Sequence, residues 1–299
     1  MKKTVILGVI VAFAIVLGGC SAKKQETVVL NLGMMPAVDA APILYAQEKG
    51  IFDGLNLEVN VDIYQNAMER QSALQSHHID AALTDVIALM QNVNAGFDMK
   101  ITLSTDTSFL LVTKDPNRLD VEHLKAALME VSVTNYLTDQ ALGGKNVEKI
   151  YINDIPARLE MIGSGNVDVA VIPEPVASMG VLNGLTKTEI ELNDSFSPNV
   201  IVFTDKAIAE KHDAIQAFHQ GYNQAVTAMA NDEAGVRSIL VKRLGLKPEI
   251  EQDIVLPQYQ VVRVPSKEYL ERLASWSQNV LDTVATVDYD SMVDAQFVQ

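Results

Sequence analysis

The chain has 299 residues, 48% of them hydrophobic, a composition typical of a folded globular protein with room for one or two large cores. Its formal charge of −15 argues against nucleic acid and anionic lipid surfaces as partners, because both are recognised by clusters of Lys and Arg. The single cysteine, Cys20, excludes intramolecular disulfides and zinc or iron–sulfur sites built on several cysteines.

The first twenty residues have the pattern of an export signal. Two lysines precede an apolar run, Val5–Leu17, and small residues follow it. As a helix this run would span about 20 Å, well short of the roughly 30 Å hydrocarbon core, so a permanent transmembrane helix is the weaker interpretation. The stretch Leu17–Cys20 resembles a bacterial lipobox; a chance cysteine near an ordinary cleavage site is the alternative. We expect residues 1–20 to be a lipoprotein signal peptide with Cys20 lipidated, residues 21–27 to be a linker, and an extracytoplasmic, membrane-anchored domain to follow.

From Val28 onwards, apolar runs of strand length alternate with amphipathic segments of helix length. The expected strands are Val28–Met35, Leu57–Tyr64, Asp80–Thr84, Met99–Thr105, Phe109–Thr113, Val131–Thr134, Val147–Ile152, Val167–Ile172 and Val200–Thr204. The expected helices are Ala40–Lys49, Ala67–Ser76, Val86–Ala95, Leu137–Leu142, Ile155–Ile162, Asp213–Ala230, Glu233–Leu244 and Ser266–Val284. Strands that alternate with helices predict an α/β fold with parallel sheets covered on both faces.

An internal similarity at an offset of 88 residues indicates two related halves. The matched pairs are Arg70 and Arg158, Ser76 and Ser164, Asp80 and Asp168, and Ala82 and Ala170. We therefore expect two α/β lobes, with residues 28–108 and 203–299 in the first and residues 109–202 in the second. The chain would cross between them near Thr105–Phe109 and near Val200–Thr204. Clefts between lobes are common sites for small ligands.

Four groups of residues resemble the motifs of a known family. They are Gly33–Pro36, Ala46–Leu55, Ala73–Ala82 and Ser164–Pro175. In order and spacing they resemble the nitrate/sulfonate/taurine and thiamine-precursor binding proteins of ABC importers, over about Val28 to Ser178. The resemblance implies a type II periplasmic-binding-protein fold, in which two lobes joined by two crossover strands close on a small solute. It also implies a membrane permease and an ATPase as partners, and a monomer that needs neither cofactor nor metal.

In such folds the ligand contacts loops at the carboxyl ends of strands and helix N-termini that face the cleft. This rule selects as candidate ligand-binding residues Met34, Pro36, Asp39, Thr84, Asp85, Asp106, Thr107, Ser108, Asn135, Tyr136, Thr138 and Glu174. Asp39, Asp85 and Asn135 also occupy positions where helix caps belong. Glu174 would suit a helix N-terminus, and Tyr136 would suit a core.

This candidate set is rich in carboxylates and contains no Lys or Arg. Uncompensated carboxylates repel a bound anion when both are desolvated. The set therefore favours a neutral or cationic ligand containing nitrogen, such as a pyrimidine thiamine precursor. Helix N-termini and neutral donors also bind anions, so nitrate, taurine and other sulfonates stay open as the alternative.

Catalytic motifs are weak in this sequence. His77 and His78 are adjacent, and neighbouring side chains on a helix point apart, which disfavours a shared metal. Gly143-Gly144-Lys145 lacks the first glycine and the Ser or Thr of a phosphate-binding loop. The main alternative from another class is a biosynthetic enzyme with the same fold, which the export signal disfavours. A tethered sensor that presents its ligand to a membrane receptor is a third interpretation.

Overall fold

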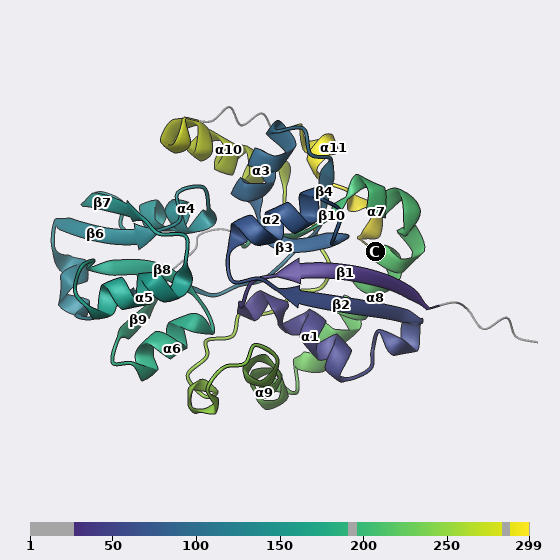
Figure 1. The fold of residues 1–299 in the computed structure, drawn as a ribbon, viewed down its shortest axis with the longest axis horizontal. Helices are drawn as coiled ribbons and strands as arrows, with labels where there is room; N and C mark the ends of the chain where they lie inside the picture. The colour runs from purple at the N-terminus through teal and green to yellow at the C-terminus, as the bar shows by residue number, and fades with distance from the viewer. Residues whose placement is uncertain (1–26, 191–195, 283–287, 299) are drawn as a thin grey trace, which may run out of the picture.

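Two α/β lobes lie side by side in the computed structural model, which describes residues 27–190, 196–282 and 288–298 (Figure 1). Each lobe is built on one five-stranded sheet. The expected signal peptide and Cys20 lie outside the described residues. Within the described ranges, no helix is both long enough and apolar enough to cross a membrane. The expected architecture, a type II periplasmic-binding-protein fold, is confirmed.

The sheet of the first lobe has the strand order β2-β1-β3-β10-β4. Its strands are β1 (Val28–Met34), β2 (Leu57–Ile63), β3 (Ala81–Asp85), β4 (Met99–Ser104) and β10 (Asn199–Thr204). β1 is parallel to β2 and β3, whereas β10 lies antiparallel to β3 and β4. The expectation of an all-parallel sheet is therefore wrong, because β10 starts at the edge facing the second lobe, where β3 ends.

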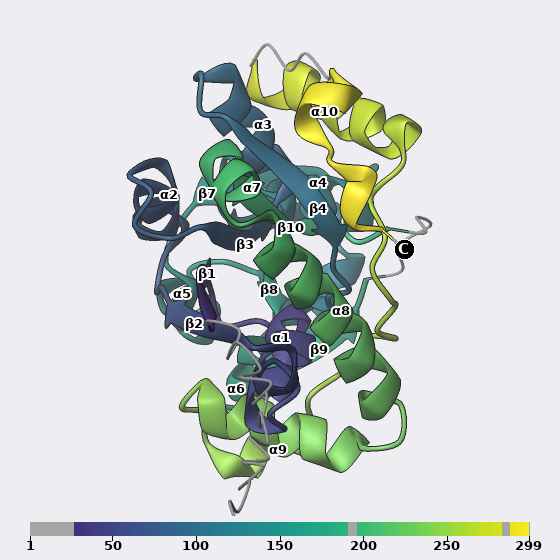
Figure 2. The ribbon, with the colours of Figure 1, turned by 90° about the vertical axis from the view of Figure 1, so that its right-hand side faces the viewer.

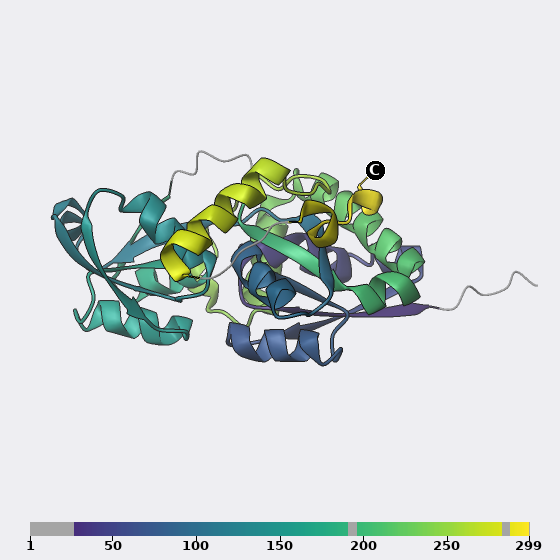
Figure 3. The ribbon, with the colours of Figure 1, turned by 90° about the horizontal axis from the view of Figure 1, so that it is seen from above.

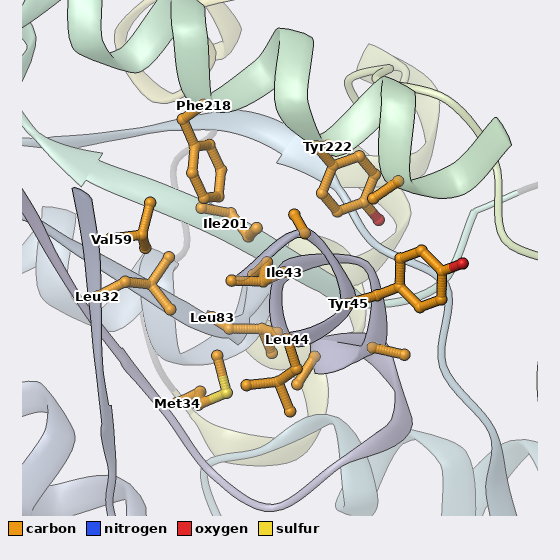
Figure 4. Close-up of a cluster of buried hydrophobic side chains, with 14 of the residues drawn as sticks. Leu32, Met34, Ile43, Leu44, Tyr45, Val59, Leu83, Ile201, Phe218 and Tyr222 are labelled. Carbon is orange, nitrogen blue, oxygen red and sulfur yellow. The ribbon is translucent and has the colours of Figure 1, made fainter. Parts of the chain in front are cut away.

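Helices cover both faces of this sheet, and alternate residues of β10 serve the two sides. Ile201 and Phe203 join a core with α1 (Ala41–Glu48), α8 (His212–Met229) and α9 (Glu233–Arg243) (Figure 4). Val200 and Val202 join a core with α2 (Ala67–Gln75), α3 (Val86–Asn94) and α10 (Lys267–Leu281). Figure 2 shows α3 and α10 on one side of the sheet and α1, α8 and α9 on the other. This alternation is the period of two that a strand buried on both faces requires.

The second lobe has the strand order β7-β6-β8-β5-β9. Its strands are β5 (Phe109–Thr113), β6 (His123–Leu128), β7 (Asn146–Tyr151), β8 (Val169–Pro173) and β9 (Thr186–Glu189), and its helices are α4 (Val133–Ala141), α5 (Ile155–Gly163) and α6 (Val176–Leu182). The strand expected over Val131–Thr134 is wrong. Ser132 caps a helix there, its hydroxyl accepting a hydrogen bond from the amide of Thr134 at 3.1 Å.

Short elements complete the fold. They are α7 (Asp205–Glu210), α11 (Tyr289–Met292) and the 3₁₀ segments Val38–Ala40, Asp53–Leu55, Pro116–Asp120, Pro248–Ile250 and Ala295–Phe297. The last long helix, expected to reach Val284, ends at Leu281, because Asp282 adopts a left-handed conformation with φ of 50°. Positions 283 and 284 lie outside the described residues.

The first crossing between the lobes runs from Ser104 at the end of β4 to Phe109 at the start of β5. The return crossing lies between β9 and β10, and includes residues 191–195, outside the described ranges. All of β10 pairs with strands of the first sheet, including residues 199–202, which the residue pattern predicts in the second lobe. The crossing therefore precedes Asn199.

A third connection is made by α10, which lies across the junction of the lobes (Figure 3). It packs on α3 of the first lobe. Its Trp276 contacts the ring of Tyr136 in α4 edge to face, with centroids 5.5 Å apart, and donates an indole hydrogen bond to Asp139 at 3.0 Å. The lobes are thus joined by side-chain packing as well as by the chain itself.

Candidate functional site: a pocket between the lobes

A small pocket with a cavity volume of about 60 Å³ lies between the lobes. It is lined by Met35, Pro36, Ala37, Ala67, Arg70, Leu83, Thr84, Asp85 and Asn199 of the first lobe, and by Phe109, Met129, Ser132, Val133, Thr134, Ile155, Arg158 and Pro173 of the second. These positions lie at or just after the carboxyl ends of β1, β3, β6 and β8, in the first turns of α2, α4 and α5, and at the starts of β5 and β10. This is where ligands are expected in open α/β sheets.

Two buried arginines, one from each lobe, reach this pocket. Arg70 of α2 is 4% exposed; its Nη2 donates to Oγ1 of Thr84 at 2.8 Å, and its Nε has no partner among the described residues. Arg158 of α5 is completely buried. Its Nη1 donates to the carbonyl of Val171 at 3.2 Å, whereas Nε and Nη2 have no partner in the described part of the chain.

The two arginines occupy equivalent places in their lobes. Each lies on the helix that precedes a buried strand, α2 before β3 and α5 before β8. The offset of 88 residues in the sequence relates them to each other. The candidate set contains no Lys or Arg because its members come from strand ends, whereas these arginines reach the pocket from helices.

Both guanidinium groups are desolvated, which lowers their pKa values because burial disfavours the charged form. For Arg158 the pKa falls to about 10, so the group stays charged at neutral pH. Arg70 is partly compensated by the carboxylates of Asp85 and Asp39. The carboxylate near Arg158 is that of Asp154, which caps α5 by accepting from the amide of Ala157 at 2.8 Å.

A buried cation without a carboxylate partner is unfavourable, because its lost hydration is not replaced. Among the described residues no carboxylate forms a hydrogen bond with Arg158, on which Asp154 acts only through space, and two of its N–H donors are free. An anion with two oxygens would provide the charge and the acceptors that Arg158 lacks.

Asp85 lines the pocket, and Asp39 is a second buried carboxylate near Arg70. Asp85 caps α3, accepting from the amide of Ala88 at 2.8 Å, and burial raises the pKa of its carboxyl. Asp39 does not line the pocket and does not cap a helix. Its Oδ2 accepts from Nδ2 of Asn199 at 2.7 Å and from Oγ1 of Thr105 at 3.3 Å, and burial raises its pKa to about 6. Asp39 thus joins residues at the ends of both crossings.

Glu174 lies away from the pocket and is saturated by protein partners. Its fully buried carboxylate forms an ion pair with Nζ of Lys187 at 2.5 Å. It also accepts from the hydroxyl of Ser178 at 2.9 and 3.0 Å and from the amide of Val255 at 3.0 Å. Val255 belongs to the C-terminal part of the chain, so Glu174 ties that segment to the second lobe.

Three other candidates lie outside the lining and have protein partners. Asp106 pairs with Arg263 at 2.6 Å. Asn135 accepts from Lys149 at 2.7 Å, and the hydroxyl of Thr138 donates to the carbonyl of Thr134 at 2.7 Å.

Four more candidates also lie outside the lining. Met34 is a core residue, and Tyr136 packs on Trp276. The hydroxyl of Thr107 is buried without a partner in the described structure, and the carbonyl of Ser108 accepts from the amide of Glu174 at 2.9 Å. Of the twelve candidates, the pocket gathers Pro36, Thr84 and Asp85.

A larger chamber of about 650 Å³ adjoins the pocket. Pro36 and Ile155 border both spaces. Its apolar walls include Ile63, Leu159, Val176, Met179, Leu185 and Leu246, which come from both lobes. The cleft thus has a small charged inner part and a wide apolar outer part, whose volume lies in the range of small-molecule sites.

The sequence model of the NMT1-like family matches residues 23–245, about three quarters of the chain. A comparison with curated protein sequences finds no match. Solved structures resemble the fold at low sequence identity. A zinc-bound ligand-binding component of an ABC-type import system from Staphylococcus aureus has a TM-score of 0.76 at 16% identity, covering 91% of this chain and 98% of that one.

Two further structures bind anions according to their names. The periplasmic aliphatic sulphonate binding protein SsuA from Escherichia coli has a TM-score of 0.71 at 16% identity, covering 89% of this chain and 92% of that one. The periplasmic nitrate-binding protein NrtA from Synechocystis has a TM-score of 0.69 at 16% identity, covering 89% and 84%. At these identities the likeness shows the fold.

Proposed function

This chain belongs to the NMT1-like family, and on that basis we propose that it is the solute-binding component of an ABC importer. It captures a small organic anion between its lobes and delivers it to a membrane permease driven by an ATPase. The fold, shared with a protein named as a ligand-binding component of ABC-type import and with one named for sulphonate binding, supports the general role. The observation that carries the anion is the pair Arg70 and Arg158, buried in one pocket from opposite lobes.

Capture needs no covalent step. The solute enters while the lobes are apart, and closure about the crossings brings Arg158 of one lobe and Arg70 of the other onto the same ligand. Ligand contacts that exist only in the closed arrangement shift the population towards it. This role is binding and release rather than catalysis.

We place the protein outside the cytoplasm, anchored to the cell membrane through lipidated Cys20. The support is the apolar run that ends in Leu17-Gly18-Gly19-Cys20. Metabolic labelling with a fatty-acid analogue tests it. Wild-type protein should take up label and partition with membranes, and the Cys20→Ala variant should do neither. Equal labelling of the two proteins would contradict the anchor.

Mass spectrometry of whatever co-purifies with the protein tests the solute class. An organic anion is the expected result, and a pyrimidine or an amine would support the neutral or cationic ligand that the candidate set favours. Deletion of the permease and ATPase genes should then abolish uptake of that compound. Normal uptake after the deletion would contradict the importer and favour a sensor.

A further inference from the structure

The free hydrogen-bonding groups of Arg158 are arranged on one edge of its guanidinium. Nη1 is held by the carbonyl of Val171 at 3.2 Å, and the two nitrogens without a partner among the described residues are Nε and Nη2. These two N–H groups are parallel and form the edge of an arginine that binds two oxygens at once. A planar carboxylate matches this edge with both of its oxygens.

The charges around the pocket limit the charge of the ligand. Arg70 has Asp85 and Asp39 as electrostatic partners, and Arg158 has Asp154. Among the described residues, however, no carboxylate forms a hydrogen bond with the guanidinium of Arg158. A single carboxylate would provide the direct partner that Arg158 lacks. A phosphate ester, with nearly two negative charges at neutral pH, would place excess negative charge beside Asp85.

The hydroxyl groups of the pocket already have partners, whereas Nε of Arg70 has none among the described residues. The hydroxyl of Thr84 accepts from Arg70 at 2.8 Å. The hydroxyl of Thr134 accepts from the amide of Met129 at 3.1 Å, and that of Ser132 accepts from the amide of Thr134 at 3.1 Å. A cavity of about 60 Å³ holds a small planar group more readily than a bulky tetrahedral one.

The apolar lining of the larger chamber indicates the chemical character of the rest of the ligand. It has about ten times the volume of the inner pocket, and Pro36 and Ile155 border both spaces. A ligand whose anionic end lies against Arg158 would extend past these residues to Leu159, Met179 and Leu246. Burial of apolar ligand surface there would add affinity in proportion to its area.

Resting on the proposed capture function, we infer that the solute is an organic monocarboxylate with an apolar body. Its carboxylate binds the Nε–Nη2 edge of Arg158, and its body occupies the outer chamber. Arg158 is thus the residue that determines the chemical class of the solute.

Calorimetric titration of the wild-type protein with a matched series of probes tests this. The series is hexanoate, acetate, hexane-1-sulfonate, hexanamide and hexylamine. Hexanoate should bind at least tenfold more tightly than hexane-1-sulfonate or acetate, and the amide and the amine should not bind. Equal or tighter binding of the sulfonate would overturn the carboxylate, while anion capture would stand.

Three other binding results would contradict the inference, in part or as a whole. Acetate as tight as hexanoate would overturn the apolar body. Absence of hexanoate binding would overturn the inference as a whole. Binding of hexanamide or hexylamine as tight as that of hexanoate would overturn both this inference and the proposed capture of an anion.

Variants of Arg158 separate the contribution of its paired N–H donors to binding from that of its positive charge. Arg158→Lys keeps the charge and loses the paired donors, so hexanoate affinity should fall at least tenfold. Arg158→Gln should lose hexanoate binding, and its melting temperature without probe should equal or exceed that of the wild type, because a buried charge without a directly bonded carboxylate is gone. Arg118→Lys, at an exposed ion pair of the same lobe, is the matched control and should bind normally. Unchanged affinity in Arg158→Lys would overturn the assignment.

Discussion

Oδ2 of Asp39 lies 2.7 Å from Nδ2 of Asn199, and this hydrogen bond links the segment after β1 to the first residue of the returning strand. The same oxygen accepts from Thr105 at the first crossing, whereas Oδ1 is buried and has no partner among the described residues. The carboxylate is fully buried, and its pKa is raised to about 6 from an ordinary 3.8.

Asp39→Asn should stabilise the protein at high pH. A folded-state pKa above the unfolded value means that the stabilising contribution is present below pH 3.8 and is lost as the pH rises through 6. The neutral amide keeps one acceptor oxygen and avoids the buried charge. We expect its free energy of unfolding to exceed that of the wild type by about 1–3 kcal/mol at pH 8. Urea titrations should show that this difference in the free energy of unfolding shrinks towards pH 4. A variant that is equally less stable than the wild type at pH 8 and at pH 4 would contradict the prediction.

Breaking the ion pair of Glu174 should be costly. Lys187→Met leaves a completely buried carboxylate without its cation, which should lower the free energy of unfolding by about 3–5 kcal/mol. The double variant with Glu174→Gln should recover most of this loss, because no buried charge is then left unpaired. Lys125→Met, at the exposed pair with Glu148, is the control and should change stability by less than about 1 kcal/mol. A double variant no better than the single one would show that the cost is not electrostatic.

Gly221 of α8 has no room for a side chain. A Cβ there would lie 2.6 Å from Cε1 of Phe52, a buried ring stacked on Phe218. Gly221→Ala should therefore destabilise by about 1–3 kcal/mol, although alanine is the better helix former. At Gly163, the last residue of α5, the Cβ would meet nothing within 4 Å. Gly163→Ala should be neutral or stabilise by up to about 1 kcal/mol in thermal unfolding. The reverse order would contradict the packing argument.

Trp276 is the single tryptophan of the chain and contacts the second lobe from α10. Its emission should report on the arrangement of the lobes. The solute identified by mass spectrometry should reduce quenching by acrylamide, because closure keeps the indole against Tyr136. Asp139→Asn should shift the emission without abolishing binding. Identical quenching at zero and saturating solute would mean that Trp276 does not sense closure.

Residue patterns predicted most of the elements of the fold. Regular strands such as Phe109–Thr113 appear where expected, because an uninterrupted apolar run between polar turns has few other solutions. β6 escaped prediction, since His123–Leu128 contains lysine and alanines of weak strand preference and is held by pairing with β7 and β8. Pairing with distant strands is invisible in a local pattern.

The candidate site was harder to predict. Thr84 and Asp85 line the pocket because the ends of buried strands meet at the cleft, which topology alone dictates. Arg70 and Arg158 line the pocket from opposite lobes but lie on helices, where arginine usually faces solvent. Their equivalence at an offset of 88 residues was the available signal, because both repeats place a cation before the strand that faces the cleft.

The contacts of α10 have a consequence for the rates of solute exchange. Trp276 and Asp139 join the lobes through protein groups alone, so a movement of the lobes apart at α10 would have to break these contacts. Residues far from the pocket would then govern how fast the protein loads and unloads, while the pocket governs how tightly it holds. A weaker contact of α10 would raise both the association rate and the dissociation rate of the solute. The dissociation constant alone would therefore not describe how well the protein serves transport.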